Sequence, residues 1–295
     1  MLYDVTLRIE YVYDTPVSGG RHMVRVLPLS IGGRQRLVAG SIDVMPRPIE
    51  RTNVTDFFDN PAMSILFRSV HDRLDIKMQA RVHVDGQDPT PDFSPQLDGL
   101  PDDIVSYWSL DAGSPHHYVG PSPRLPHCPE IAEYASRFVT PDMTVREIAK
   151  AICAGIHKDF TYDAKATTVD TTPRESFKLK RGVCQDFTHV MIVALRSLGI
   201  PAGYVSGFLR TIPPPGKERL EGADAMHAWV RFWGGRINGW MELDPTNNIP
   251  AGTDHIVVGY GRDYSDVAPV IGILKGYGRH KTDQAVDVVP VHQFA

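Results

Sequence analysis

Residues 181–201 have the sequence RGVCQDFTHVMIVALRSLGIP, and they predict the central helix of the fold. From Phe187 onward, apolar side chains recur at spacings of three and four residues, which is typical of an amphipathic helix with one buried face. We expect the helix to end at Gly199, because glycine accepts the left-handed cap and Pro201 cannot continue the hydrogen-bond ladder. The predicted buried face consists of Phe187, Val190, Met191, Ala194, Leu195 and Leu198.

Cys184 stands at the first turn of this predicted helix, just after Gly182. The first backbone N–H groups of a helix lack intrahelical partners, and the helix dipole also favours negative charge there. Such a position generally lowers the pKa of a thiol and favours the nucleophilic thiolate. The alternative is a small buried apolar residue, as most free cysteines are. The helix alone favours that alternative, and the partners found later in the chain reverse the preference.

Composition limits the classes of function that the chain can have. Its 295 residues suffice for one large domain or two ordinary ones. With 31 basic and 35 acidic residues the net charge is −4, so we expect neither nucleic acid nor a membrane surface as a partner. Three cysteines argue against a disulfide framework, and no signal peptide or membrane-spanning run is recognisable. We therefore expect a cytoplasmic protein, and the sequence leaves its oligomeric state open.

The first part of the chain alternates apolar and polar residues, most clearly over residues 5–13 and 76–84. Several such short runs, separated by glycine and proline turns, predict an antiparallel β-sandwich. A connector rich in proline follows at residues 85–129, and its histidines and Cys128 match no common zinc spacing. We assign residues 1–120 to an N-terminal β-sandwich domain with this connector and residues 121–295 to a catalytic domain. No metal and no cofactor are expected.

A hairpin near residues 226–244 supplies the partners of Cys184. Alternation places His227, Trp229 and Arg231 on one face of its first strand. If Trp233 pairs with Asn238 across a four-residue connection, His227 lies directly opposite Asp244, with Cβ atoms about 4.5–5.5 Å apart. A slip of one residue would break this arrangement. The predicted register therefore joins a histidine to a carboxylate that can orient it.

Cys184, His227 and Asp244 together offer the groups that amide cleavage requires. The thiolate attacks, the histidine shares its proton and returns it to the leaving amine, and the aspartate fixes the imidazole. The backbone N–H of Cys184 is a candidate oxyanion donor. His189 competes as the base, but five residues along a helix turn it by about 140°, so it faces elsewhere. We expect it to pair with Asp186 on the helix instead.

At these residues the chain resembles the transglutaminase-like superfamily of papain-type cysteine enzymes. The resemblance rests on GVCQDFTH at 182–189, HAWV at 227–230 and DPTN at 244–247, in the family's order of Cys, His and Asp. Segments 11–16 and 259–267 resemble bacterial members considered to be cysteine proteases, although Thr188 replaces an expected alanine. The resemblance implies an α+β fold, with a papain/transglutaminase-like catalytic domain preceded by an antiparallel β-sandwich domain.

The same resemblance implies chemistry on an amide. We expect a cysteine-dependent peptide or isopeptide hydrolase that works through a thioester acyl-enzyme. Transfer of a glutamine acyl group to an amine is the alternative within enzymes, and a non-catalytic peptide-binding module is the alternative outside them. No acidic cluster resembles the calcium sites of animal transglutaminases.

Three aromatic residues complete the expected site. Tyr162 lies where the family places an aromatic oxyanion helper, although a packed aromatic at the end of a helix fits the sequence equally well. Trp229 and Trp240 would flank the site on the hairpin face. They would either line a groove for the peptide or protein substrate or pack beneath the neighbouring domain.

Overall fold

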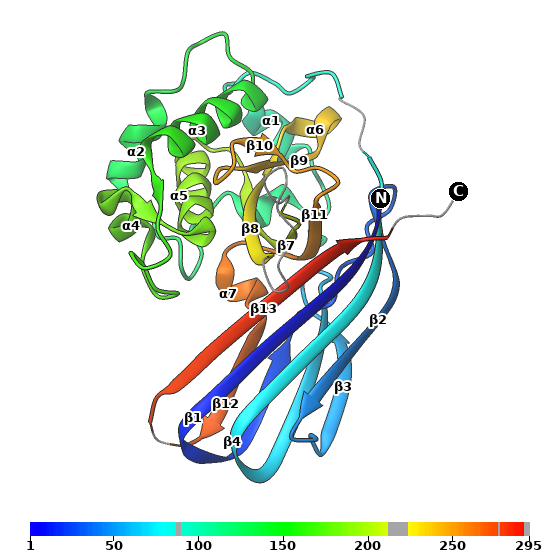
Figure 1. Ribbon diagram of the computed structural model, residues 1–295. Helices are drawn as coiled ribbons and strands as arrows, with labels where there is room; N and C mark the ends of the chain where they lie inside the picture. The colour runs from blue at the N-terminus through cyan, green and yellow to red at the C-terminus, as the bar shows by residue number, and fades with distance from the viewer. Residues whose placement is uncertain (87–89, 212–223, 277, 292–295) are drawn as a thin grey trace, which may run out of the picture.

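A computed structural model describes residues 1–86, 90–211, 224–276 and 278–291 of the chain. It contains two large antiparallel sheets, one built mainly from the N-terminal residues and the other surrounded by helices (Figure 1). This architecture confirms the expected α+β fold. Among the described residues, no helix is long and apolar enough to cross a membrane.

The N-terminal sheet has six strands: β1 (Leu2–Val24), β2 (Gln35–Met45), β3 (Glu50–Thr55), β4 (Pro61–Val84), β12 (Val270–Lys275) and β13 (His280–Pro290). The long strands β1 and β4 pair along most of their lengths. On its other edge β1 pairs with β13 and then β12, while β4 pairs with β3 and then β2. Alternate residues of both halves are buried in one hydrophobic cluster. The apolar core that was expected between the two layers of a sandwich is therefore built by the two halves of one continuous sheet.

Strands β12 and β13 correct the expected division of the chain. Residues 121–295 were assigned to a single catalytic domain, yet β12 and β13 hydrogen-bond to β1 in the N-terminal sheet. Val286 and Val288 of β13 are buried in that sheet's apolar cluster. The last strands return because the edge of β1 would otherwise expose a long row of unpaired backbone groups.

The second sheet has the strand order β10-β9-β8-β7-β11, with every neighbouring pair antiparallel where pairing is described. Its strands are β7 (Ala202–Leu209), β8 (Ala225–Trp233), β9 (Trp240–Asp244), β10 (Ile249–Pro250) and β11 (His255–Gly261). The helices are α1 (Leu100–Val105), the 3₁₀ helix η1 (Pro115–Tyr118), α2 (Pro129–Ser136), α3 (Val145–Asp159), α4 (Pro173–Leu179), α5 (Cys184–Ser197), α6 (Gly235–Asn238) and α7 (Tyr264–Val267). A short parallel pair, β5 (Thr161–Tyr162) and β6 (Arg181–Gly182), leads into α5.

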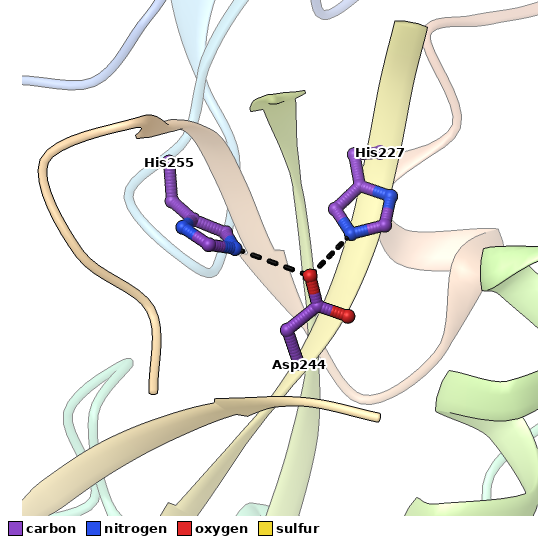
Figure 2. Close-up of side chains that lie close together, drawn as sticks. All are labelled: His227, Asp244 and His255. Atoms are coloured by element: carbon purple, nitrogen blue, oxygen red, sulfur yellow. Dashed lines mark hydrogen bonds and ion pairs between the residues drawn. The ribbon is translucent and has the colours of Figure 1, made fainter. Parts of the chain in front are cut away.

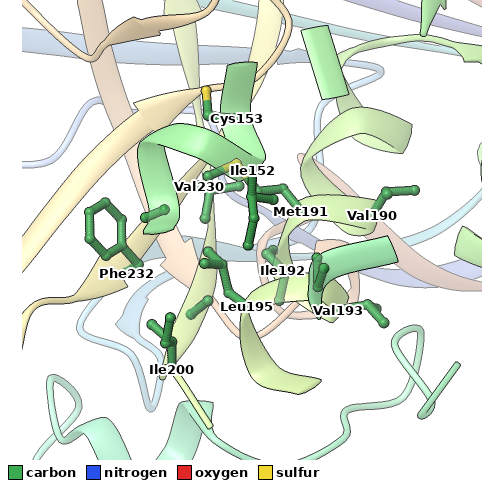
Figure 3. Packing of buried hydrophobic residues seen from close by; sticks show 14 of the residues in the cluster. Ile152, Cys153, Val190, Met191, Ile192, Val193, Leu195, Ile200, Val230 and Phe232 are labelled. Carbon is green, nitrogen blue, oxygen red and sulfur yellow. The ribbon is translucent and has the colours of Figure 1, made fainter. Parts of the chain in front are cut away.

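Helix α5 occupies the centre of the helical half of the molecule. It packs against β8 on one side and against α2, α3 and α4 on others. Figure 3 shows Met191, Ile192 and Leu195 of α5 gathered with Ile152 of α3 and Val230 of β8. The spacing of apolar residues in the sequence therefore predicted the helix, while its burial on several sides comes from the three surrounding helices.

The two sheets share apolar contacts. Phe208 of β7 and Ile256 and Val258 of β11 are buried in the same cluster as the core of the N-terminal sheet. The second sheet is therefore held against the first by burial of apolar surface, which is the main stabilising contribution in protein interiors.

Candidate active site

The sequence around α5 places Cys184 as the first residue of the helix, half-buried, with Val183 as the N-cap. Asp186 holds this helix end, because one oxygen of its carboxylate accepts hydrogen bonds from the backbone N–H of Val183 at 2.8 Å and from the hydroxyl of Thr167 at 2.7 Å. A Cβ atom added to Gly182 would lie 2.4 Å from Asp186 Oδ2, so glycine is required there. The backbone thus fixes the position of the thiol.

The hairpin of β8 and β9 brings His227 and Asp244 together, but in a register that differs from the predicted one. Trp233 pairs with Trp240 and not with Asn238, so the predicted register was wrong by two residues. The reason is that α6 and Gly239, with φ of 61°, lengthen the connection. A shift of two residues keeps every side chain on its face, so the two side chains still meet.

Nε2 of His227 and Oδ2 of Asp244 are 2.7 Å apart (Figure 2). Asp244 is fully buried, and its carboxylate accepts hydrogen bonds from several sides. Oδ2 also accepts from the side-chain amide of Asn247 at 2.7 Å and lies 3.2 Å from Nε2 of His255, while Oδ1 accepts from the backbone N–H groups of Thr246 and Asn247. Although burial opposes ionisation, these donors hold the pKa of Asp244 well below its usual range. The carboxylate therefore stays charged.

Cys184 also interacts with the imidazole of His227. Burial of His227 disfavours its charged form, but the negative charge of Cys184 and hydrogen bonds to Asp244 and Cys184 raise the pKa of His227 to about 10. Since Nε2 is used by Asp244, the other ring nitrogen, Nδ1, is the one left for the thiol, and in Figure 2 it points away from the carboxylate. The arrangement therefore favours the protonated imidazolium form of His227 beside Cys184.

Tyr162 lies beside the same thiol. Its strand β5 pairs with β6, opposite Gly182, so it stands next to the residues that lead into Cys184. Burial and the charge of Cys184 both raise the pKa of Tyr162, yet 57% of the residue remains exposed. A neutral hydroxyl therefore stands near the thiol and in contact with solvent.

Trp229 is buried and does not line the expected groove. Trp229 is completely buried with Val205, Val257 and Leu29, and its Nε1 donates to Glu242 at 2.6 Å. Because Leu29 belongs to the N-terminal part of the chain, Trp229 packs beneath the neighbouring domain, which was the alternative interpretation.

Trp240 lies at the opposite end of β9 from Asp244. Its ring packs against Tyr118 and Arg231, and its Nε1 donates to the backbone oxygen of Gly113 at 2.7 Å. These contacts attach the connector to the second sheet, so Trp240 does not flank His227 and Asp244, whereas the ring of Trp229 stacks near that of His227.

His189 faces away from the site, as its position on the helix predicted. It is buried, which lowers its pKa to about 3, and its Nε2 accepts a hydrogen bond from the backbone N–H of Tyr264 at 3.4 Å. The expected pairing with Asp186 was wrong, since the described hydrogen bonds of that carboxylate go to Thr167 and Val183.

His255 was missed by the sequence analysis. It opens β11, is 2% exposed and contacts Asp244. Strand β11 pairs with β7 and is therefore not a neighbour of β9 in the sheet, so no pairing argument brings it to Asp244. The available signal was a histidine opening an apolar strand, because a buried ring nitrogen needs a polar partner.

His227, Asp244 and His255 also form a group whose ligand atoms lie within 4.8 Å of one another, close enough for a metal ion to be considered. However, Nδ1 of His255 accepts a hydrogen bond from the backbone N–H of Gly252 at 3.2 Å. A neutral imidazole that accepts at Nδ1 carries its proton on Nε2, and this nitrogen is then a donor and not a metal ligand. The cluster is therefore best described as a hydrogen-bonded carboxylate.

Comparisons with known proteins show the family and the fold of this chain. Residues 132–245 match the model of the transglutaminase-like superfamily, and residues 3–83 match that of the bacterial transglutaminase-like N-terminal region. An uncharacterised protein of Mycobacterium tuberculosis is 34% identical over 301 residues, which cover 98% of this chain and 92% of the relative. Another from Mycobacterium leprae is 27% identical over 281 residues, covering 94% and 95%.

Among solved structures, a protein of Cytophaga hutchinsonii that was proposed to be a cysteine protease has a TM-score of 0.76 and 19% identity. The match covers 100% of this chain and 92% of that protein. The fold is therefore shared across both sheets.

Proposed function

Because this chain belongs to the transglutaminase-like superfamily, we propose that it is a cysteine-dependent hydrolase of peptide or isopeptide amides. The observation that carries the proposal is the imidazole of His227, bound at Nε2 by the buried Asp244 and influenced from its other side by Cys184. A thiol next to a base that is itself oriented by a carboxylate is the arrangement needed for nucleophilic catalysis.

In the proposed acylation, the thiolate of Cys184 attacks the amide carbonyl carbon and forms a C–S bond. The C–N bond then breaks, and the imidazolium of His227 gives its proton to the leaving nitrogen, so that an amine departs and a thioester remains. Asp244 stabilises the imidazolium and keeps the proton-transferring nitrogen directed at the thiol and the leaving group.

In the proposed deacylation, water attacks the thioester carbonyl carbon while His227 accepts a proton from it. The C–S bond breaks, and a carboxylic acid and the free enzyme are produced. If an amine takes the place of water, the same acyl-enzyme yields a new amide. Hydrolysis and acyl transfer therefore share the first step and differ only in the second nucleophile.

Two groups are proposed as oxyanion donors. The backbone N–H of Cys184 lies at the first position of α5, where helix N–H groups have no intrahelical acceptor. The hydroxyl of Tyr162 is the second, and the raised pKa of this residue keeps the hydroxyl protonated as a donor. Both would stabilise negative charge that develops on the carbonyl oxygen.

The proposal is tested by incubating the protein with a library of peptide amides, with and without an excess of primary amine, and by analysing the products by mass spectrometry. We expect water-derived acids that are absent with the Cys184→Ala variant. Predominant amine adducts would indicate acyl transfer. Equal turnover by Cys184→Ala would exclude the proposed nucleophile, and peptide binding without turnover by either protein would favour the binding module.

The proposed location is the cytoplasm, since all three cysteines are free thiols. Cell fractionation with an antibody against the chain tests this, and recovery outside the cytoplasm would contradict it.

A further inference from the structure

We propose that His255 is a positioning residue that holds the Asp244 carboxylate in the orientation His227 requires. The inference rests on the proposed function, because it assigns His255 a task in the same site. His255 acts through Asp244 and has no described contact with Cys184, so it is not itself a catalytic residue.

The hydrogen bonds of His255 determine where its proton lies. A backbone N–H can only donate, and that of Gly252 points at Nδ1 of His255 at 3.2 Å, so Nδ1 carries a lone pair. The proton of the neutral ring is therefore on Nε2, which lies 3.2 Å from Oδ2 of Asp244 and donates to it. A backbone turn thus selects the tautomer of His255 that Asp244 needs.

Oδ2 of Asp244 then has three side-chain donors, namely His227, His255 and Asn247. Figure 2 shows that the two imidazoles approach this oxygen from different sides, one from β8 and one from the start of β11. Since Thr246 and Asn247 hold Oδ1 through their backbone N–H groups, rotation of the carboxylate would break bonds at both oxygens. His255 therefore helps to fix the orientation in which the Asp244 carboxylate accepts the hydrogen bond from His227.

The N-terminal domain fixes the strand that carries His255. The side chain of Gln35, at the start of β2, accepts from the backbone N–H of Val257 and donates to its carbonyl oxygen, both at 2.8 Å. Val257 lies two residues after His255. This pair of hydrogen bonds takes the place of a neighbouring strand for β11, and both Gln35 and Val257 are buried. Through it, the N-terminal sheet helps to set the position of the second histidine.

Packing also limits the freedom of His255. Its ring contacts the buried ring of Trp229 edge-on, with centroids 5.1 Å apart. Trp229 in turn stacks near His227, with centroids 6.0 Å apart, and donates to Glu242. A fully buried aromatic residue of this size therefore packs against both histidines, whose own ring centroids lie 6.2 Å apart, and limits the orientations that each can take toward Asp244.

A matched pair of variants separates the donor from the ring. In His255→Asn the side-chain oxygen can still accept from Gly252, but no donor reaches Asp244. In His255→Gln the amide nitrogen occupies the place of Nε2 and can donate to Asp244. The Asn variant therefore keeps the hydrogen bond to Gly252 and the Gln variant keeps the hydrogen bond to Asp244, so the pair shows which of the two bonds the site needs.

Two measurements are made on each protein: peptide-amide hydrolysis, and the rate of Cys184 alkylation by iodoacetamide as a function of pH. Because one hydrogen bond to a charged group is lost, we expect His255→Asn to lower kcat by about ten- to hundredfold with little change in KM. We also expect its alkylation curve to move toward higher pH. His255→Gln should recover much of both losses.

The alkylation curve does not require turnover, so it tests His255 even if no substrate is cleaved. Hydrolysis that survives Cys184→Ala would refute the proposed function and leave the alkylation comparison valid. A His255→Asn curve that coincides with that of the wild type would overturn the role of His255, as would equal shifts in the Asn and Gln variants. Should His255→Asn fail to fold, His255→Met takes its place against His255→Gln, with the same expected difference.

Discussion

Two cysteines flank the pair formed by His227 and Asp244, and they differ in almost every property that controls thiol reactivity. Cys153 lies within α3, is 1% exposed, and its Sγ is 3.6 Å from the backbone oxygen of Asp244. Burial raises the pKa of Cys153 to about 12, and the charge of Asp244 adds to the effect. Cys184 is half-buried at the beginning of α5 and interacts with His227. Proximity to His227 and Asp244 is therefore not sufficient to make a thiol reactive.

The two thiols differ in the charges around them and in whether an imidazole lies beside them. Cys153 packs beside Ile152 in the apolar core (Figure 3), where a thiolate would have no favourable partner. Cys184 has a helix N-terminus behind it and an imidazole in front of it. The comparison predicts that changes at the two positions affect different properties, namely catalysis at Cys184 and stability at Cys153.

The largest expected effect is loss of catalysis in Cys184→Ser, because a hydroxyl is far less acidic than a thiol and does not form the reactive anion. Cys153→Ala, the matched control, should keep its activity within about threefold, since Cys153 has no proposed role in the reaction. Rates of peptide-amide hydrolysis with purified proteins measure both. Activity lost in Cys153→Ala and kept in Cys184→Ser would reverse the assignment.

Asp244→Asn should lower the acylation rate by up to roughly 10⁴-fold, because the imidazole would be held in a poorer tautomer. Single-turnover kinetics measure the acylation step directly. A wild-type rate in a folded Asp244→Asn protein would show that the carboxylate serves only the structure and would weaken the contrast between the two thiols.

Tyr162→Phe sharpens the same comparison, since Tyr162 brings a hydroxyl near Cys184. If that hydroxyl donates to the oxyanion, its removal should cost about 10²–10³-fold in kcat. Thermal unfolding should change little because Tyr162 is largely exposed. A kcat equal to that of the wild type would assign Tyr162 to packing, the other interpretation of its sequence position.

The smallest expected effect concerns Cys153 at high pH. Its folded pKa is raised, so the stability it contributes is complete below the unfolded value of about 8.5 and is lost as the pH rises toward about 12. At pH 10, this term destabilises the wild type by roughly 2 kcal/mol relative to neutral pH. Denaturant unfolding should therefore show a smaller alkaline loss in Cys153→Ala than in the wild type. Parallel losses in the two proteins would contradict the raised pKa.

Local patterns predicted much of this site. The spacing of apolar residues located α5, and alternation placed His227 and Asp244 on one face of a hairpin. The register was wrong by two residues because α6 forms within a connection that was expected to be a simple turn. The prediction that His227 and Asp244 share a face was nevertheless correct, because side chains alternate with a period of two and a shift of two residues leaves each on its face.

Long-range topology could not be predicted in the same way. His255 reaches Asp244 because the chain after β10 crosses to the opposite edge of the sheet, where β11 pairs with β7. Similarly, β13 comes from the end of the chain and pairs with β1 at its beginning. Neither contact leaves a periodic signal near the residues involved. The burial of Trp229 likewise depends on Leu29, which belongs to the N-terminal part of the chain.

The central claim is that Cys184 is the reactive thiol, and alkylation tests it most directly. The folded protein is treated with a limiting amount of iodoacetamide near neutral pH, digested and analysed by peptide mapping for Cys128, Cys153 and Cys184. We expect Cys184 to be modified first and the two buried cysteines to react only after denaturation. Modification of Cys153 at a rate equal to or above that of Cys184 would contradict the account.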